Sequence, residues 1–157
     1  MDIVLMTVGK TRIAFAAEGI KEYSRRLARY VPFVVSELPD VRSTRAMTEE
    51  LQKEREGTMI LDKISPADFV VLLDERGRQF SSVEFASYME KLMGSGRKRM
   101  VFVIGGPYGF SEDVYARADA KLSLSRMTFN HEMVRMFFVE QIYRAMTILR
   151  GEPYHHE

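Results

Sequence analysis

Residues 100–109 read MVFVIGGPYG, in which five apolar residues run directly into a loop that contains three glycines. An apolar run that ends at glycine is typical of a strand buried on both faces, as in a parallel sheet. Asp2–Val8, Phe33–Leu38 and Phe69–Leu73 have the same character. A more polar fifth strand is predicted over Leu122–Met127.

Five helices are predicted between and after these strands, from apolar spacings of three and four residues and from capping residues. Ser81 and Glu84 stand in the S-x-x-E order of a capping box. The alternation of strand and helix predicts a single α/β domain over residues 1–157, a mostly parallel sheet with helices on both faces. The expected helices cover about residues 13–30, Thr48 to Ser65, Ser82 to Gly94, a short segment after Ser111, and 131–149, where Asn130 is the expected cap.

The composition fits one globular domain and excludes several kinds of protein and site. Of the 157 residues, 46% are hydrophobic and 29% charged, which excludes disordered, collagenous and membrane classes. The absence of cysteine rules out disulfides, thiolate metal ligands and a cysteine nucleophile. Two of the three histidines, His155 and His156, lie at the C-terminus, so no metal site is expected. No targeting segment or membrane span is recognisable, and a cytoplasmic protein is expected.

Charge is unevenly distributed, although the net charge is only +1. Residues 1–30 carry six basic and three acidic side chains, and residues 94–157 carry nine and seven. Residues 31–93 are acidic, with eight basic and twelve acidic side chains. The two ends of the chain are therefore candidates for contact with a polyanion, and the alternative is that these charges lie on solvated helix faces.

The loop Gly105-Gly106-Pro107-Tyr108-Gly109 is the first candidate for a ligand site. Ligands of parallel sheets bind beyond the carboxyl ends of the strands, and glycines let backbone approach a ligand closely. The loop is neither G-x-G-x-x-G nor a P-loop, so two common nucleotide-binding folds are disfavoured. The alternative is a tight turn between strand and helix.

The last predicted helix is apolar almost all round, and a reactive tail follows it. Such a helix is either buried within the fold or packed against a second copy of the chain. Packing against a second copy is favoured, and Phe138 and Ile142 are then expected at the subunit interface. The tail, residues 150–157, contains an aromatic ring, two imidazoles and two carboxylates, which suggests a functional segment. The alternative is a frayed, disordered end.

Four stretches together resemble one family. They are VFVIGGPYGF at 101–110, LSLSRMTFNHEMVRMFFVEQIYRAMTILRGEPYHHE at 122–157, DIVLMTVGK at 2–10 and VVLLDERGRQFSS at 70–82. These stretches, spread over essentially the whole chain, resemble the small ribosomal RNA methyltransferase H family of the SPOUT (α/β-knot) class. The resemblance implies a deep trefoil knot at the C-terminal end, which general rules of chain topology make rare. It also implies a homodimer with cofactor sites at the subunit interface.

The resemblance further implies the reaction, which is transfer of a methyl group from S-adenosylmethionine to N3 of a pseudouridine in 23S rRNA on the assembled ribosome. Two alternatives stay open. One is a SPOUT methyltransferase acting on another RNA position, and the other is a non-catalytic ribosome-binding protein of the same fold.

Site residues are implied position by position. A side chain at Gly106 is expected to enter the adenosine space, and His155 is the candidate general base. Asn130 replaces a proline of many relatives, and His156 replaces a basic residue. The cofactor is expected to contact Leu73, Gly105, Gly106, Ser125, Arg126, Met127, Thr128, Phe129 and Asn130. The catalytic set is Arg135, Tyr154 and His155, with Tyr143 and His156 binding the RNA.

Overall fold

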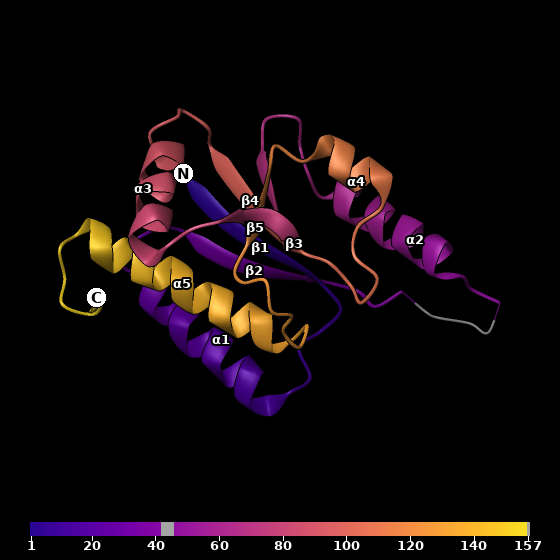
Figure 1. Cartoon of the computed structure of the whole chain (residues 1–157), viewed down its shortest axis with the longest axis horizontal. Helices are drawn as coiled ribbons and strands as arrows, with labels where there is room; N and C mark the ends of the chain where they lie inside the picture. Colours follow the sequence, from indigo (N-terminus) through magenta and orange to yellow (C-terminus); the bar gives the residue numbers. More distant parts are fainter. Residues whose placement is uncertain (42–45, 157) are drawn as a thin grey trace.

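The computed structural model describes residues 1–41 and 46–156, and within them five parallel strands form one sheet between two layers of helices (Figure 1). The strand order across the sheet is β2-β1-β4-β3-β5. The predicted α/β sheet with helices on both faces is therefore confirmed. The strands are β1 (Asp2–Val8), β2 (Phe33–Leu38), β3 (Phe69–Gln79), β4 (Arg99–Ile104) and β5 (Ala120–Ser123).

Two separate apolar cores hold the layers together, one on each face of the sheet. In β1, Ile3 and Leu5 belong to the core under α1, α3 and α5, whereas Val4 and Met6 belong to the core under α2 and α4. This alternation follows from the two-residue period of a strand, and it explains why strands buried on both faces are continuously apolar. The helices are α1 (Ala14–Leu27), α2 (Glu49–Asp62), α3 (Ser82–Met93), α4 (Glu112–Arg117) and α5 (Met133–Leu149).

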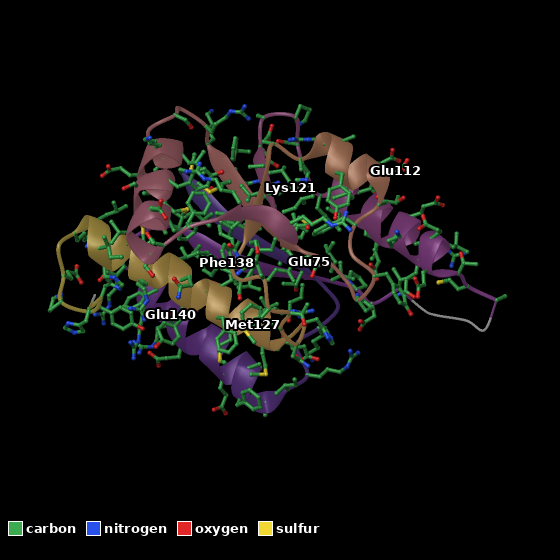
Figure 2. All side chains as sticks on the ribbon, in the orientation of Figure 1. Glu75, Glu112, Lys121, Met127, Phe138 and Glu140 are labelled. Carbon is green, nitrogen blue, oxygen red and sulfur yellow. The ribbon has the colours of Figure 1, made fainter. Side chains whose placement is uncertain are left out.

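Helix α5 is buried by its own protomer, which corrects one expectation. Phe138 and Ile142 are fully buried in the core against the sheet, so they are not interface residues. Figure 2 labels Phe138 on α5. A Cβ added to Gly19 of α1 would lie 2.2 Å from the sulfur of Met136, which shows how closely α1 and α5 pack. Most of the apolar side chains of α5 therefore belong to the core of the protomer. None of the described helices is long and apolar enough to cross a membrane.

The sheet edge departs from the prediction at β3 and β5. Strand β3 continues past Leu73 to Gln79, with a register shift against β5 between Leu73 and Arg78. A Cβ on Gly77 would lie 2.6 Å from backbone atoms of Leu122, so only glycine allows this approach. Strand β5 ends at Ser123, and Ser125 to Thr128 form a loop instead of its last residues.

Side-chain caps are found at the starts of α2, α3 and α4, but not at those of α1 and α5. Ser81 and Glu84 form the predicted capping box at α3. Helix α1 has no side-chain cap at Ile13. Instead, one carboxylate oxygen of Glu132 accepts from the backbone N–H of Arg12 at 2.5 Å and of Ile13 at 2.7 Å. A residue about 120 positions away thereby satisfies donors beside the first turn of α1.

Candidate functional site

A cavity of about 660 Å³ opens at the carboxyl ends of β4 and β5, the edge of a parallel sheet where ligands bind. Its walls come from residues 73–76 within β3, from the loops after β4 and β5 and from the start of α5, with Glu49 and Lys53 of α2 at one side. Leu73, Ile104 and Leu122 supply apolar surface. Its size is that of a site for a small molecule or cofactor.

The glycine loop presents backbone to this cavity because its far side is already filled. A Cβ on Gly105 would lie 2.9 Å from the ring of Phe110. A Cβ on Gly106 would lie 2.5 Å from both carboxylate oxygens of Glu56, which is not among the cavity-lining residues. The expectation that a side chain at Gly106 enters the ligand space is therefore wrong, since the side chain would point toward α2. Gly109 closes the turn at φ +84°, and its N–H donates to the Gly106 carbonyl at 3.2 Å.

Charged and phenolic groups line the rim of the cavity, and sequence reasoning did not single them out. Asp74, Glu75 and Arg76 follow Leu73 on the wall formed by β3. The hydroxyl of Tyr115 donates to the Asp74 carboxylate. Partial burial and this hydrogen bond raise the pKa of Tyr115 to about 12, so the phenol stays protonated at neutral pH. The signal in the sequence was the position of Asp74 directly after a buried strand.

Most of the expected cofactor residues gather at this cavity, and two do not. Arg126 is exposed outside the lining. Asn130 turns toward the start of α5, where its Oδ1 accepts from the N–H groups of Glu132 and Met133 at 2.9 and 3.1 Å. The N-cap position of α5 is Glu132 and not the predicted Asn130, which instead satisfies donors at the entry to the helix. The expected residues that line the cavity are Leu73, Gly105, Gly106, Ser125, Met127, Thr128 and Phe129.

Arg135 is buried and fully engaged within its own protomer. The side chain is 1% exposed, and its guanidinium donates to the carbonyls of Val8 and Gly9 at 2.8 Å and to the hydroxyl of Thr11 at 2.9 Å. It also lies 3.5 Å from the carboxylate of Glu37. These contacts tie the start of α5 to the end of β1. The expected catalytic contact of Arg135 with RNA has no support in this geometry.

The tail folds back along α5 instead of fraying. Tyr154 donates to Glu140 at 2.8 Å, and its hydroxyl lies 3.2 Å from that of Tyr23 on α1. Its ring packs edge-on against Tyr143, with centroids 4.7 Å apart. Burial and the hydrogen bonds to Tyr23 and Glu140 raise the pKa of Tyr154 well above its usual range. Tyr154 is therefore a neutral hydrogen-bonding group and not a base.

His155 is held by Arg144, a residue that sequence reasoning did not select. One guanidinium nitrogen of Arg144 lies 3.0 Å from Nδ1 of His155, and the other donates to Glu140 at 2.6 Å. Because a guanidinium only donates, Nδ1 must accept, which puts the proton of a neutral imidazole on Nε2. His156 is exposed, and Tyr143 is half-buried among aromatic rings.

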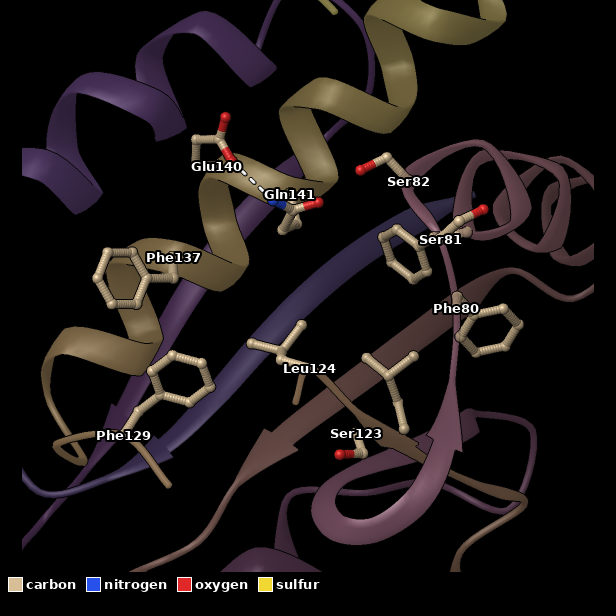
Figure 3. A pocket seen from close by; sticks show the side chains of 11 residues that line it. Phe80, Ser81, Ser82, Ser123, Leu124, Phe129, Phe137, Glu140 and Gln141 are labelled. Carbon is tan, nitrogen blue, oxygen red and sulfur yellow. Dashed lines mark hydrogen bonds between the residues drawn. The ribbon is translucent and has the colours of Figure 1, made fainter. Parts of the chain in front are cut away.

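A second cavity of about 390 Å³ adjoins the first, and the two share Leu122, Ser123, Leu124 and Phe129. Figure 3 shows Phe129 and Phe137 on one side of it and Phe80, Ser81 and Ser82 on the other. Glu140, which binds Tyr154, and Gln141 lie on its α5 side. The tail therefore contacts a wall residue, Glu140, of a cavity that adjoins the larger one.

Within one protomer the tail and the larger cavity remain apart. Val134 lines the cavity, whereas Arg144 holds His155 ten residues later, about 15 Å farther along the helix axis. Figure 1 shows the tail and the loop before α5 at opposite ends of that helix. No described tail residue lines either cavity. Glu157, the last residue of the predicted tail, lies outside the described part of the chain.

A metal site is not found among residues 1–41 and 46–156, where no group of three or more histidine or acidic side chains is placed to bind an ion.

Comparisons with known proteins point in one direction. Residues 1–155 match the family described as "Predicted SPOUT methyltransferase". A protein of Parabacteroides distasonis named Ribosomal RNA large subunit methyltransferase H is 53% identical over 157 residues, which is 100% of both chains. The protein of that name from Christiangramia forsetii is 55% identical over 156 residues, or 99% of each chain. In fold, the chain is similar to a probable methylase family protein from Haemophilus influenzae Rd KW20, with a TM-score of 0.50, 12% identity, and coverage of 95% of this chain and 66% of that one.

Proposed function

Because the chain belongs to the SPOUT methyltransferase family, we propose that it transfers a methyl group from S-adenosylmethionine to large-subunit ribosomal RNA. The target we infer is N3 of a pseudouridine in 23S rRNA on the assembled ribosome. The observation that carries the proposal is the 660 Å³ cavity between the glycine loop and the loop after β5. The full-length curated relatives named as large-subunit rRNA methyltransferases support the choice of substrate.

The residues of the cavity fit the cofactor. Leu73, Ile104 and Leu122 offer apolar surface for the adenine, and Gly105 and Gly106 expose peptide groups that can hydrogen-bond it. Asp74 and Glu75 at the rim suit the hydroxyl and ammonium groups of the ligand. When bound there, S-adenosylmethionine supplies an electrophilic methyl group.

On the substrate side, His155 acts as the base that takes the proton from N3. Its Nδ1 lone pair is engaged by Arg144 in the protomer, so proton abstraction requires that contact to open. Tyr154 contacts the target base through its ring, because its only hydroxyl proton is donated to Glu140. Tyr143 and His156 complete the RNA contact.

A homodimer would bring the cofactor cavity of one subunit and the tail of the other together. The roughly 15 Å between Val134 and Arg144 along α5 is too long for a base and a methyl donor to meet in one protomer. The tail of one subunit must therefore reach the cavity of the other. Exposed apolar side chains beside the cavity and on α1 suit such an interface: Met127 is 78% exposed, Phe15 58% and Phe137 36%.

A C-terminal trefoil knot is part of this proposal. The close crossing of Gly77 over Leu122 and the return of α5 from the sheet edge to α1 are compatible with a threaded chain. An enzyme acting on ribosomes would work in the cytoplasm, as the sequence led us to expect.

The decisive experiment uses ribosomes from a strain that lacks the modification. The purified protein and S-adenosylmethionine should raise the mass of one 23S rRNA fragment by one methyl group, at a pseudouridine. Methylation at another RNA position would replace the substrate assignment. Saturable cofactor binding without any methylation would favour the non-catalytic ribosome-binding alternative.

A further inference from the structure

Glu56 is a buried carboxylate placed directly behind the glycine loop. It is 3% exposed and lies on α2, on the opposite side of the loop from the cavity. Its Oε2 accepts from the side-chain amide of Gln52 at 3.2 Å, and among the residues that the structure describes its Oε1 has no hydrogen-bond partner. A buried acceptor without a partner costs roughly 1–3 kcal/mol, so its presence calls for an explanation.

The carboxylate fills the space that a side chain at Gly106 would occupy. A Cβ on Gly106 would lie 2.5 Å from each oxygen of Glu56 and 2.8 Å from Cδ, distances that atoms do not tolerate. Glu56 can therefore contact the loop only because residue 106 is glycine. Any side chain at position 106 would clash with the Glu56 carboxylate.

Gly57 and Ser111 form a second close contact between α2 and the other end of the same loop. A Cβ on Gly57 would lie 2.4 Å from Oγ of Ser111, the residue that caps α4. Adjacent residues of α2 thus contact the beginning of the loop at Gly106 and its end at Ser111. A rigid helix that touches a loop at both ends fixes its shape.

We propose that Glu56 is a positioning residue of the cofactor cavity, whose carboxyl group packs under Gly106 and holds the Gly105–Phe110 loop in the shape that receives the cofactor. The inference rests on the proposed function only in naming the ligand. Burial raises the pKa of Glu56, although the hydrogen bond from Gln52 opposes the rise. A protonated carboxyl would give the group a donor of its own beneath the loop.

The test measures binding of S-adenosylhomocysteine by calorimetry to Glu56→Ala, Glu56→Gln, Gly106→Ala and the double variant Glu56→Ala with Gly106→Ala. Glu56→Gln keeps shape and polarity and should bind within about threefold of the unchanged protein, whereas Glu56→Ala should bind about tenfold more weakly. Gly106→Ala should also weaken binding about tenfold. In the double variant the new methyl group occupies the space vacated by the carboxyl, so binding should be no weaker than in Glu56→Ala.

Controls separate this role from general damage. Glu54→Ala removes an exposed carboxylate from the same helix, and Gly94→Ala adds a methyl group whose nearest neighbours are 3.5 Å away. Both should bind like the unchanged protein. Glu56→Ala also loses the hydrogen bond from Gln52 and leaves a buried void, so urea unfolding measures its stability separately and affinity is compared under conditions where every variant is fully folded. If Glu56→Ala does not fold, Glu56→Asp replaces it in the double-mutant cycle with Gly106→Ala, because it leaves a smaller void.

Two results would overturn the inference: unchanged binding in Glu56→Ala, or losses from Gly106→Ala and Glu56→Ala that simply add. If the unchanged protein itself does not bind S-adenosylhomocysteine, the proposed function fails instead, and the two failures are therefore distinguishable.

Discussion

The hydroxyl of Tyr154 donates a 2.8 Å hydrogen bond to the carboxylate of Glu140, which lies 14 residues earlier in the sequence, on α5. This contact folds the tail onto the helix, and Arg144 reinforces it by binding both Glu140 and His155. Figure 2 shows Glu140 farther along α5 than Met127, which lies in the loop before the helix. The tail is therefore packed against α5 and stands away from the larger cavity of its own protomer.

Deletion of residues 154–157 should abolish methylation of ribosomes and leave S-adenosylhomocysteine affinity within about twofold, because no described residue of this segment lines the cavity. Radiolabel transfer and calorimetry measure the two properties. Tyr154→Phe, which keeps the ring and loses the hydrogen bond, should fall between the deletion and the unchanged protein. Normal methylation by the truncated chain would remove the tail from the mechanism.

Replacement of Arg135 by methionine should destabilise the protein by about 3 kcal/mol, since the carbonyls of Val8 and Gly9 would lose a buried charged donor. Urea unfolding measures the change. Arg126→Ala, at an exposed position, should shift stability by less than about 0.5 kcal/mol. A folded, fully stable Arg135→Met protein without activity would instead restore the catalytic reading of this residue.

Charge placed at Phe137 and Phe138, which are adjacent in sequence, should have opposite consequences. Phe137→Glu introduces a charge at a partly exposed position beside the second cavity and should give a folded monomer. Phe138→Glu buries that charge in the core and should prevent folding. Light scattering and circular dichroism distinguish the two results. A stable dimer of Phe137→Glu would exclude this surface from the interface.

Asp68 should make stability depend on pH in the acid range. Burial acts to raise its pKa, but hydrogen bonds from Arg99 at 2.6 and 2.9 Å, together with one from the Ser65 N–H, outweigh burial and lower it. A lowered pKa adds stability above the unfolded value of about 4, and this stability is lost as pH falls through the folded value.

Asp68→Asn should therefore be less stable than the unchanged protein at pH 7, and the difference should shrink at pH 3. Urea unfolding at both values provides the comparison, with the exposed Asp62→Asn as control. A difference of equal size at both pH values would mean that Asp68 contributes through packing and not through charge.

The sequence was sufficient for the elements whose signals are local. β1 and β2 end where predicted, and the Ser81–Glu84 box forms because both partners lie within one helical turn. The apolar stripe of α5 was harder to interpret, since periodicity shows that Phe138 is buried but not by what. Burial by the sheet and burial by a second copy leave the same pattern.

What could not be predicted depends on contacts between distant segments. Strand β3 extends to Gln79 only because β5 lies beside it, and a five-residue apolar run gives no sign of this. Glu56 reads as one more charge on a charged helix until Gly106 is brought against it. Arg135 was assigned to the RNA side through the family resemblance, but its partners are backbone carbonyls at the end of β1 and directly after it.

The carboxylate of Glu132, which accepts from the N–H groups of Arg12 and Ile13, has a consequence for the order of assembly. During synthesis the N-terminal helix leaves the ribosome long before the residue that caps it has been made. The junction between the first strand and the first helix is therefore completed last, when the final segment arrives. A nascent chain stalled before residue 132 would lack the carboxylate to which the N–H groups of Arg12 and Ile13 donate.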